Sequence, residues 1–172
     1  MLNRIIKTLI VLVLYIACQI FIFNKISVWG YFSPMIYLLF ILSLPFQTPQ
    51  WLIILSGFFV GLLIDLFSAR LGLHAFSTLV MAFLRPYIIR LISQKDNFEE
   101  HLNPLLKDMR FKWYFLYTFL LVFIHQLVYY FTEAFSLQNV WHLLFLIAIN
   151  TMVTVACIFV IQILFYPSSK RY

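Results

Sequence analysis

The residue whose type and position most clearly suggest chemistry is Asp65, because it lies inside an apolar run where an ionised side chain is costly. Gly57 and Gly61 precede it at intervals of four, which places the three residues on one face of a helix. Small residues at this spacing allow another helix to approach closely. Further candidates in the same stretch are Ser68, Gly72 and His74. We expect this face to pack against a helix, and the surface that binds a partner protein to be Gly57, Gly61 and Asp65.

Two structural roles for Asp65 stay open beside a direct role in binding a ligand or handling a proton. The carboxylate can pair with Arg70, or it can cap the start of the next apolar segment near Gly72–His74. A local structural role of this kind does not prevent the same stretch from contacting a partner.

Four other polar residues lie inside apolar segments towards the C-terminus: His125, Gln126, Asn150 and Gln162. We expect them to form hydrogen bonds between helices. A buried His can also belong to a proton relay, but His125 has no acidic partner in its own or the adjacent segment. Arg85 and Arg90 are expected near the cytoplasmic interface, where both side chains extend towards water and anionic lipid headgroups.

Patterns that support catalysis are absent from the sequence. It contains no glycine-rich phosphate loop, no metal-ligand spacing and no nucleophile elbow. Cys18 and Cys157 lie in apolar runs and are interpreted as small packing residues. We therefore expect no catalytic residues, cofactor or metal, and a protein that is not an enzyme.

The composition indicates a membrane protein. Hydrophobic residues make up 64% of the 172 residues and charged residues 10%, against about 45–50% and about 25% in soluble domains. A soluble chain of this length could not bury so much apolar surface. The net charge of +6 is explained by basic loops on the cytoplasmic side rather than by nucleic-acid binding.

The apolar segments predict an all-α fold, with residues 1–172 forming a single transmembrane domain of six helices. A spanning helix needs about 20 apolar residues. The expected spans are about 5–23, 32–46, 50–67, 72–92, 111–131 and 141–166, with a cytoplasmic loop at 93–110. The second segment is short: it is a tilted span, a re-entrant piece, or a span that begins near Tyr31. The first segment resembles a signal peptide, but its apolar run continues past Cys18 without a small-residue cleavage site, which favours an uncleaved helix.

The distribution of Lys and Arg predicts that both termini are cytoplasmic. With six spans, the cytoplasmic side holds ten basic residues: Arg4, Lys7, Arg85, Arg90, Lys95, Lys107, Arg110, Lys112, Lys170 and Arg171. The outer side holds Lys25 and Arg70. Basic residues gather on the cytoplasmic side of membrane proteins. Without the second span, the basic loop 93–110 would lie outside.

The stretch Gly57–His74, followed by Arg85 and Arg90, resembles the rod shape-determining protein MreD family. The size of the chain, its six apolar segments and its basic ends are similar to those of the family as well. The specific part covers about 35 residues, Gly57 to Leu91. The aromatic richness and the charged loop 93–110 are less typical of the family.

This resemblance implies a non-enzymatic subunit of the bacterial cell-elongation machinery in the cytoplasmic (inner) membrane. Its implied partners are a bitopic MreC-like protein, MreB filaments, and the peptidoglycan synthase RodA with its transpeptidase. The alternative is a substrate-binding subunit of a vitamin-type transporter, which has a similar six-helix architecture. In that alternative, Asp65 and His74 would lie near an outward-facing solute site.

Overall fold

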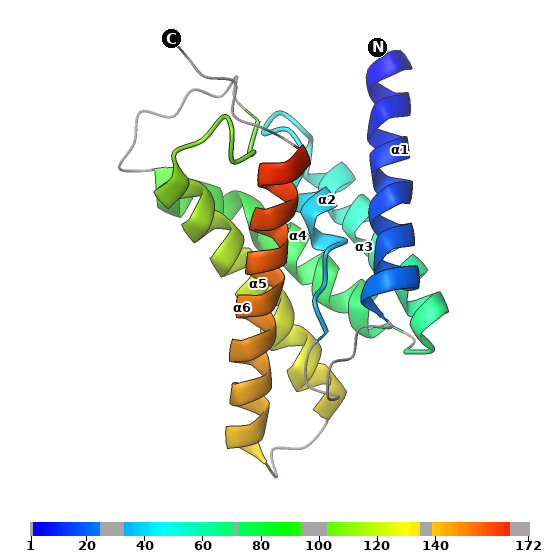
Figure 1. Ribbon diagram of the computed structural model, residues 1–172, viewed down its shortest axis with the longest axis vertical. Coiled ribbons are helices and arrows are strands. Elements are labelled where there is room, and N and C mark those ends of the chain that lie inside the picture. The colour runs from blue at the N-terminus through cyan, green and yellow to red at the C-terminus, as the bar shows by residue number, and fades with distance from the viewer. Residues whose placement is uncertain (1, 25–32, 71, 94–102, 135–138, 166–172) are drawn as a thin grey trace.

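The computed structural model describes residues 2–24, 33–70, 72–93, 103–134 and 139–165, and all regular secondary structure in these ranges is helical (Figure 1). The elements in chain order are α1 (Leu2–Cys18), the π-helical turn η1 (Gln19–Phe23), α2 (Leu38–Ser43), α3 (Gln50–Ser68), α4 (Leu73–Ser93), α5 (Phe111–Ala134) and α6 (Val140–Phe165).

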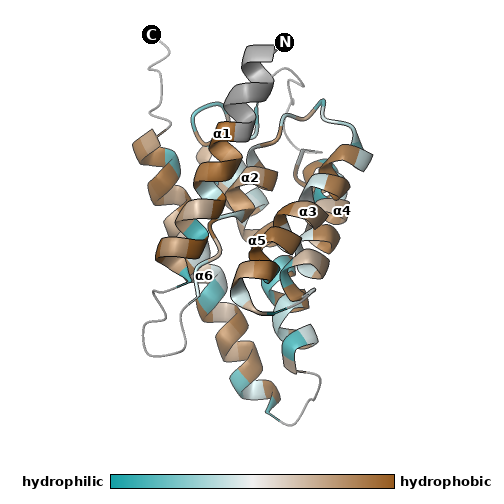
Figure 2. Cartoon of the chain, turned by 90° about the vertical axis from the view of Figure 1, so that its right-hand side faces the viewer, coloured by the Kyte–Doolittle hydropathy of each residue, from teal (hydrophilic) through white to brown (hydrophobic). Residues whose placement is uncertain are grey.

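Four of these helices, α3 to α6, are long and apolar enough to cross a membrane. They contain 19 to 26 residues, which at about 1.5 Å per residue gives lengths of about 28 to 39 Å. The hydrocarbon core of a bilayer is about 30 Å thick. Figure 2 colours long stretches of these helices as hydrophobic. The four corresponding predicted segments are confirmed as helices, with ends within three residues of those expected.

The first predicted segment is also helical. α1 continues without a break into η1, and Ile10–Phe23 is a shorter apolar helix. Several of its large apolar side chains face outwards, including Ile10, Val13 and Phe21. Outward apolar side chains are expected on a helix that faces lipid.

The second predicted segment is not a spanning helix. Within its described residues, 33–46, only Leu38–Ser43 is α-helical, and Ser33–Met35 are not in regular secondary structure. Pro34 and Pro45 bracket the apolar part of this segment and limit helix formation at both ends. The segment is nevertheless deeply buried, since Tyr37, Leu38, Leu39, Ile41 and Leu42 have no exposed surface.

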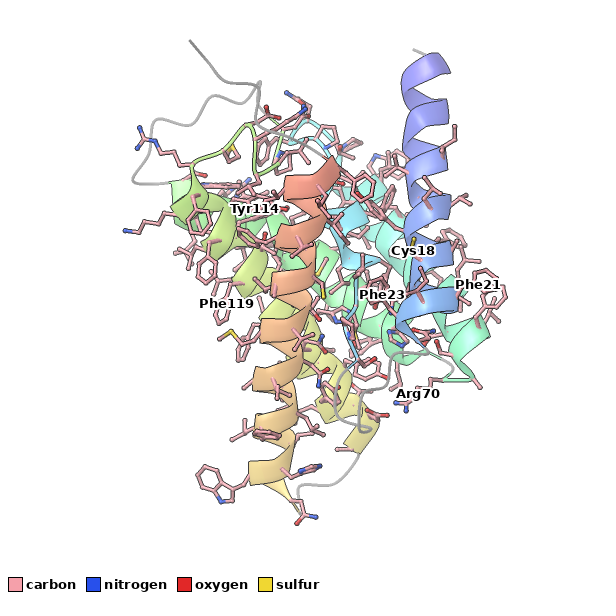
Figure 3. All side chains as sticks on the ribbon, in the orientation of Figure 1. Cys18, Phe21, Phe23, Arg70, Tyr114 and Phe119 are labelled. Carbon is pink, nitrogen blue, oxygen red and sulfur yellow. The ribbon has the colours of Figure 1, made fainter. Side chains whose placement is uncertain are left out.

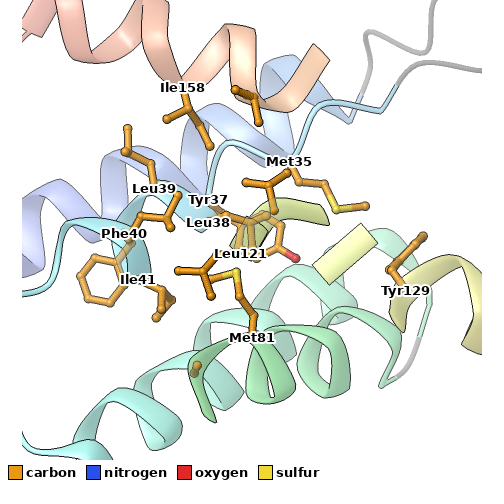
Figure 4. Packing of buried hydrophobic residues seen from close by; sticks show 14 of the residues in the cluster. Met35, Tyr37, Leu38, Leu39, Phe40, Ile41, Met81, Leu121, Tyr129 and Ile158 are labelled. Atoms are coloured by element: carbon orange, nitrogen blue, oxygen red, sulfur yellow. The ribbon is translucent and has the colours of Figure 1, made fainter. Parts of the chain in front are cut away.

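The four long helices pack in sequence order, α3 on α4, α4 on α5 and α5 on α6. The first turns of α1 and the last turns of α6 lie at the same end of the molecule, and the α3–α4 turn lies towards the opposite end (Figure 1). The short helix α2 and the segment before it run through the middle of this bundle. Figure 4 shows this segment between Ile158 of α6 and Met81 of α4.

Of the predicted cytoplasmic loop 93–110, Ser93 belongs to α4, and residues 103–110 are the other described part. Leu105 is buried, and the backbone N–H groups of Asp108 and Met109 both bond to its carbonyl. The backbone N–H of Leu106 donates to Oε1 of Gln162 near the end of α6 at 3.4 Å. This stretch is therefore held against the end of the bundle where α4 ends and α5 begins.

Candidate functional site

The centre of the molecule is a polar cluster built around residues 33–44, an irregular stretch followed by the short helix α2. A backbone that leaves helical geometry inside a bundle has N–H and C=O groups that need other partners. In a hydrocarbon environment each unpaired group costs roughly several kcal/mol. The segment is satisfied by side chains from distant parts of the chain.

Three side chains bind its first half. Gln19 of η1 donates from Nε2 to the Pro34 carbonyl at 3.0 Å and accepts the Ile36 N–H at 2.7 Å through Oε1. Asn150 accepts the Ser33 N–H at 2.7 Å, and Thr154 accepts the Met35 N–H at 3.2 Å. Gln19, Asn150 and Thr154 are almost wholly buried. The first helix and the last helix thus jointly hold the start of the central segment.

Arg85 and Tyr117 bind the carbonyl groups at the C-terminal end of α2. Arg85 is 1% exposed, donates from Nη2 to the Leu44 carbonyl, and donates from Nε to the Tyr117 hydroxyl at 2.7 Å. Tyr117 in turn donates to the Leu42 carbonyl at 3.0 Å. The expectation that Arg85 extends to water and lipid is therefore wrong. The carbonyl end of α2 and its negative dipole attract the guanidinium inwards.

Arg90 differs from Arg85 in this respect. It lies in the last turn of α4 and is exposed, as expected for a residue at the interface. A contact of Arg90 with lipid stays a prediction.

A second part of the cluster is centred on the Tyr37 hydroxyl. It lies 3.0 Å from Nδ1 of His74 and 2.9 Å from Nε2 of His125, with Thr78 Oγ1 at 3.4 Å. Because a phenol has one proton, it can donate to one imidazole while it accepts from the other. Tyr37, the residue just before α2, thus links this part of the chain to His74 of α4 and His125 of α5. Among the described residues, Nδ1 of His125 has no hydrogen-bond partner although it is buried.

Asp65 caps the N-terminus of α4. Its carboxylate accepts the backbone N–H groups of Gly72 at 3.1 Å, His74 at 3.0 Å and Ala75 at 2.9 Å. These are the donors that a helix start leaves unpaired, and a negative charge there is favoured by the helix dipole. The capping role considered for Asp65 is confirmed. Gly72 has a φ of 90°, a conformation that suits glycine and lets the chain turn back to the carboxylate.

The other role considered for Asp65, a pair with Arg70, is wrong. Arg70 donates from Nη1 to the Tyr129 hydroxyl at 2.9 Å and forms a salt bridge with Glu133. Both Arg70 and Glu133 belong to the end of the bundle opposite the first turn of α1, and Figure 3 shows Arg70 there. The pair connects the α3–α4 turn to the end of α5. Since it is partly exposed, it contributes little stability.

Gly57 and Gly61 face α4 of the same chain. A methyl group on Gly61 would lie 2.5 Å from both Cα of Ala75 and the His74 carbonyl oxygen. A methyl group on Gly57 would lie 3.0 Å from Cβ of Ala82. The proposed partner surface of Gly57, Gly61 and Asp65 is thus already covered by α4, and all three residues are buried. A partner protein cannot dock on this face without separating α3 from α4.

The other residues singled out from the sequence make hydrogen bonds elsewhere in the bundle. Ser68 accepts a hydrogen bond from Nδ2 of Asn24 at 3.0 Å, which ties the end of η1 to the end of α3. Gln126 donates to Thr154 at 3.3 Å between α5 and α6, as predicted for a polar residue inside the bundle. His74 and His125 meet at Tyr37, whereas Ser68 lies outside this cluster.

Sequence reasoning missed Gln19, Tyr37, Thr154 and Tyr117. Gln19 had a usable signal, because it is a polar residue in the middle of an apolar run. Tyr37 and Tyr117 had none, since ten tyrosines are scattered through the chain and most of them fit an interfacial role.

The contacts that the described residues make in this site are hydrogen bonds. The described residues contain no group of three or more His, Cys, Asp or Glu side chains placed to hold a metal ion. Both carboxylate oxygens of Asp65 already accept backbone donors. A hollow of about 300 Å³ lies elsewhere, at the junction of α5 and α6, and Glu133, Asn139 and His142 contribute to its lining.

No protein-family model matches this chain, and neither a curated protein nor a solved structure matches it.

Proposed function

We propose that this chain is a non-enzymatic subunit of the bacterial cell-elongation machinery, which controls rod shape through peptidoglycan synthesis. The residues that carry the resemblance to the MreD family, Gly57, Gly61, Asp65, Gly72 and His74, build the α3–α4 hairpin and its connection to Tyr37. Each of these five residues has a defined role in the close approach, the turn or the cap of the hairpin, which favours a recognisable sequence pattern. This interpretation also gives the protein its proposed place in the bacterial cytoplasmic membrane.

The observation that favours a scaffold over a solute-binding subunit is the filled centre of the bundle. Side chains of Tyr37, Leu38, Leu39, Ile41 and Leu42 occupy it with no exposed surface. The alternative of a vitamin-type transport subunit needs a pocket near Asp65 and His74. Asp65 has no exposed surface and His74 is 5% exposed, so a solute could reach neither without rearrangement.

The proposed topology has six passes with both termini in the cytoplasm, the second pass being made by the irregular segment and α2. It is supported by the position of the basic residues in the structure. Arg90, Lys107, Arg110 and Lys112 lie at the end of the bundle that also holds the end of α6, and Arg70 lies at the opposite end (Figures 1 and 3). Basic residues on one side are typical of the cytoplasmic side.

The experiment that tests this function is depletion of the protein in its native host with cell width followed by microscopy. The proposal expects rod-shaped cells to widen and become round within a few generations, and expects wild-type protein supplied in trans to restore the rod. Cells that keep their width after complete depletion would refute it. Growth that is then restored by a vitamin mixture would support the transport alternative.

The surface that binds an MreC-like partner must lie outside the α3–α4 contact. A change of Gly61 to Leu would disrupt the hairpin itself and could not report on partner binding. Capture of the partner by tagged protein should instead compare Phe58→Ala, Phe83→Ala and Phe145→Ala, which alter exposed side chains on α3, α4 and α6. Selective loss with one variant would locate the interface. Undiminished capture by all three would exclude these faces.

A further inference from the structure

The lipid-facing side of α5 carries a continuous row of four phenylalanine rings. Phe111, Phe115, Phe119 and Phe123 are spaced by four residues, so each ring neighbours the next along an inclined ridge of the helix. Their ring centroids are 6.3, 5.9 and 6.2 Å apart in order, and successive ring planes differ by only 16° or less. Phe119 projects from the outer side of the bundle in Figure 3.

The rings of this row pack against one another and against α6. Phe159 of α6 lies against its first two rings, with centroids 5.6 Å from Phe111 and 6.1 Å from Phe115. Phe111 is 66% exposed and Phe115 is 41% exposed, while Phe119 and Phe123 are half-buried. Rings that are already stacked lose little side-chain entropy when an alkyl chain lies along them.

The length of the row fits one leaflet of a membrane. From Phe111 to Phe123 the helix rises about 18 Å at about 1.5 Å per residue. One leaflet contributes about 15 Å of hydrocarbon, half of a core about 30 Å thick. Since α5 is long and apolar enough to cross a membrane, its first residue lies near an interface, and the row runs from that interface towards the midplane.

Cationic side chains lie at the interfacial end of the row. Residues 103–112 contain three exposed cations, Lys107, Arg110 and Lys112, and one acid, Asp108. Lys112 is three residues before Phe115, so the two are neighbours on the helix surface. This end of α5 also contacts the end of α4, where Nε1 of Trp113 donates to Oγ of Ser93 at 3.4 Å.

We propose that the start of α5 is a binding site for an anionic phospholipid. The phosphate group lies against Arg110 and Lys112, and one acyl chain lies along Phe111, Phe115, Phe119 and Phe123. The charge of the cations selects an anionic headgroup, and the aromatic row orders the chain below it. This site is independent of any role in cell elongation.

The test is native mass spectrometry of the purified protein released from nanodiscs of equimolar POPG and POPC. Wild-type protein is expected to retain POPG over POPC. A cation near an anionic lipid surface contributes about fivefold to affinity, so Lys112→Gln should lower POPG retention by roughly fivefold. Arg70→Gln is the control, because it removes an exposed cation at the opposite end of the bundle, and it should change retention less than twofold.

The aromatic row is tested by Phe115→Leu combined with Phe119→Leu, which keeps an apolar surface and removes the stacked rings. The matched control is Phe58→Leu combined with Phe59→Leu on the lipid-facing side of α3. Only the α5 pair should lower POPG retention, by roughly fivefold for the lost contact area. Equal retention of POPG and POPC by the wild type, or equal effects of a variant and its control, would overturn the proposal.

Discussion

Gly61 provides the sharpest test of how the α3–α4 hairpin is built. Substitution by Ala places a methyl group 2.5 Å from Cα of Ala75 and from the His74 carbonyl oxygen, and 2.7 Å from the Ala75 nitrogen. Carbon atoms in contact prefer about 3.5–4.0 Å, so the helices must separate by about 1 Å. All the atoms that clash are backbone atoms, which cannot rotate away.

The expected loss of stability combines the cost of overpacking, the gain in helix propensity and the weakening of one hydrogen bond. Overpacking of this kind costs about 1–3 kcal/mol, and occasionally more, whereas Gly to Ala in a helix gains about 1 kcal/mol. The Ala75 N–H that the methyl group would meet also bonds to Asp65, so separation weakens a charge-assisted hydrogen bond of about 1.5–3 kcal/mol. We expect Gly61→Ala to lower the free energy of unfolding by about 3 kcal/mol.

Gly57→Ala is the matched control, because it lies on the same helix face one turn earlier. Its methyl group would meet Cβ of Ala82 at 3.0 Å and the Thr78 carbonyl oxygen at 3.2 Å. Relief needs a shift of only a few tenths of an ångström, and the gain in helix propensity offsets most of that cost. We expect a change within about 1 kcal/mol.

The assay is thermal unfolding in detergent with a dye that reacts with Cys18 and Cys157 as they become accessible; both are free and half-buried. For a chain of this size, 1 kcal/mol corresponds to roughly 2–4 °C in Tm. Gly61→Ala should lower Tm by about 6–12 °C and Gly57→Ala by less than about 4 °C. Equal Tm values for the two variants would refute the close approach at Gly61.

Three further substitutions test the polar contacts of the central segment and the hairpin by the same assay. Gln19→Leu should cost about 2–5 kcal/mol, because it leaves backbone groups of Pro34 and Ile36 unpaired. Thr132→Val is its control and should cost less than about 1 kcal/mol, because the Thr132 hydroxyl bonds only to the Val128 carbonyl one turn earlier in α5; similar losses for the two variants would contradict this account. Asp65→Asn should cost about 2–3 kcal/mol, because three backbone N–H groups share the two carboxylate oxygens and an amide offers only one oxygen. An unchanged Tm would exclude the cap. Tyr37→Phe should cost about 2–3 kcal/mol because two imidazole nitrogens lose their shared partner, and a loss below about 0.5 kcal/mol would show that the hydroxyl is not needed.

The four helices that are long and apolar enough to cross a membrane could be predicted from the sequence, because their signal is local. A run of apolar residues such as Gln50–Ser68 or Val140–Phe165 must satisfy its own backbone groups in lipid, and a helix does so without help from the rest of the chain. The capping role of Asp65 was also accessible, since the turn at Gly72 lies only seven residues away.

The conformation of residues 33–44 could not be predicted, because its partners are distant in sequence. An irregular backbone is stable there only when Gln19, Asn150, Thr154, Tyr117 and Arg85 converge on it, and these residues come from four different helices. The same reason explains the misplacement of Arg85. Its distance along the helix indicated the interface, but the carbonyl end of α2 supplies the acceptors that draw it inwards.

The sequence by itself determined that this is an all-helical protein suited to a membrane, since hydropathy and helix length are properties of single segments. Only the tertiary structure decided that the small-residue face of α3 is covered by α4 rather than open to a partner. It alone also decided that the shortest apolar segment fills the core. Both outcomes depend on which surfaces meet, and that is set by side chains far apart in the chain.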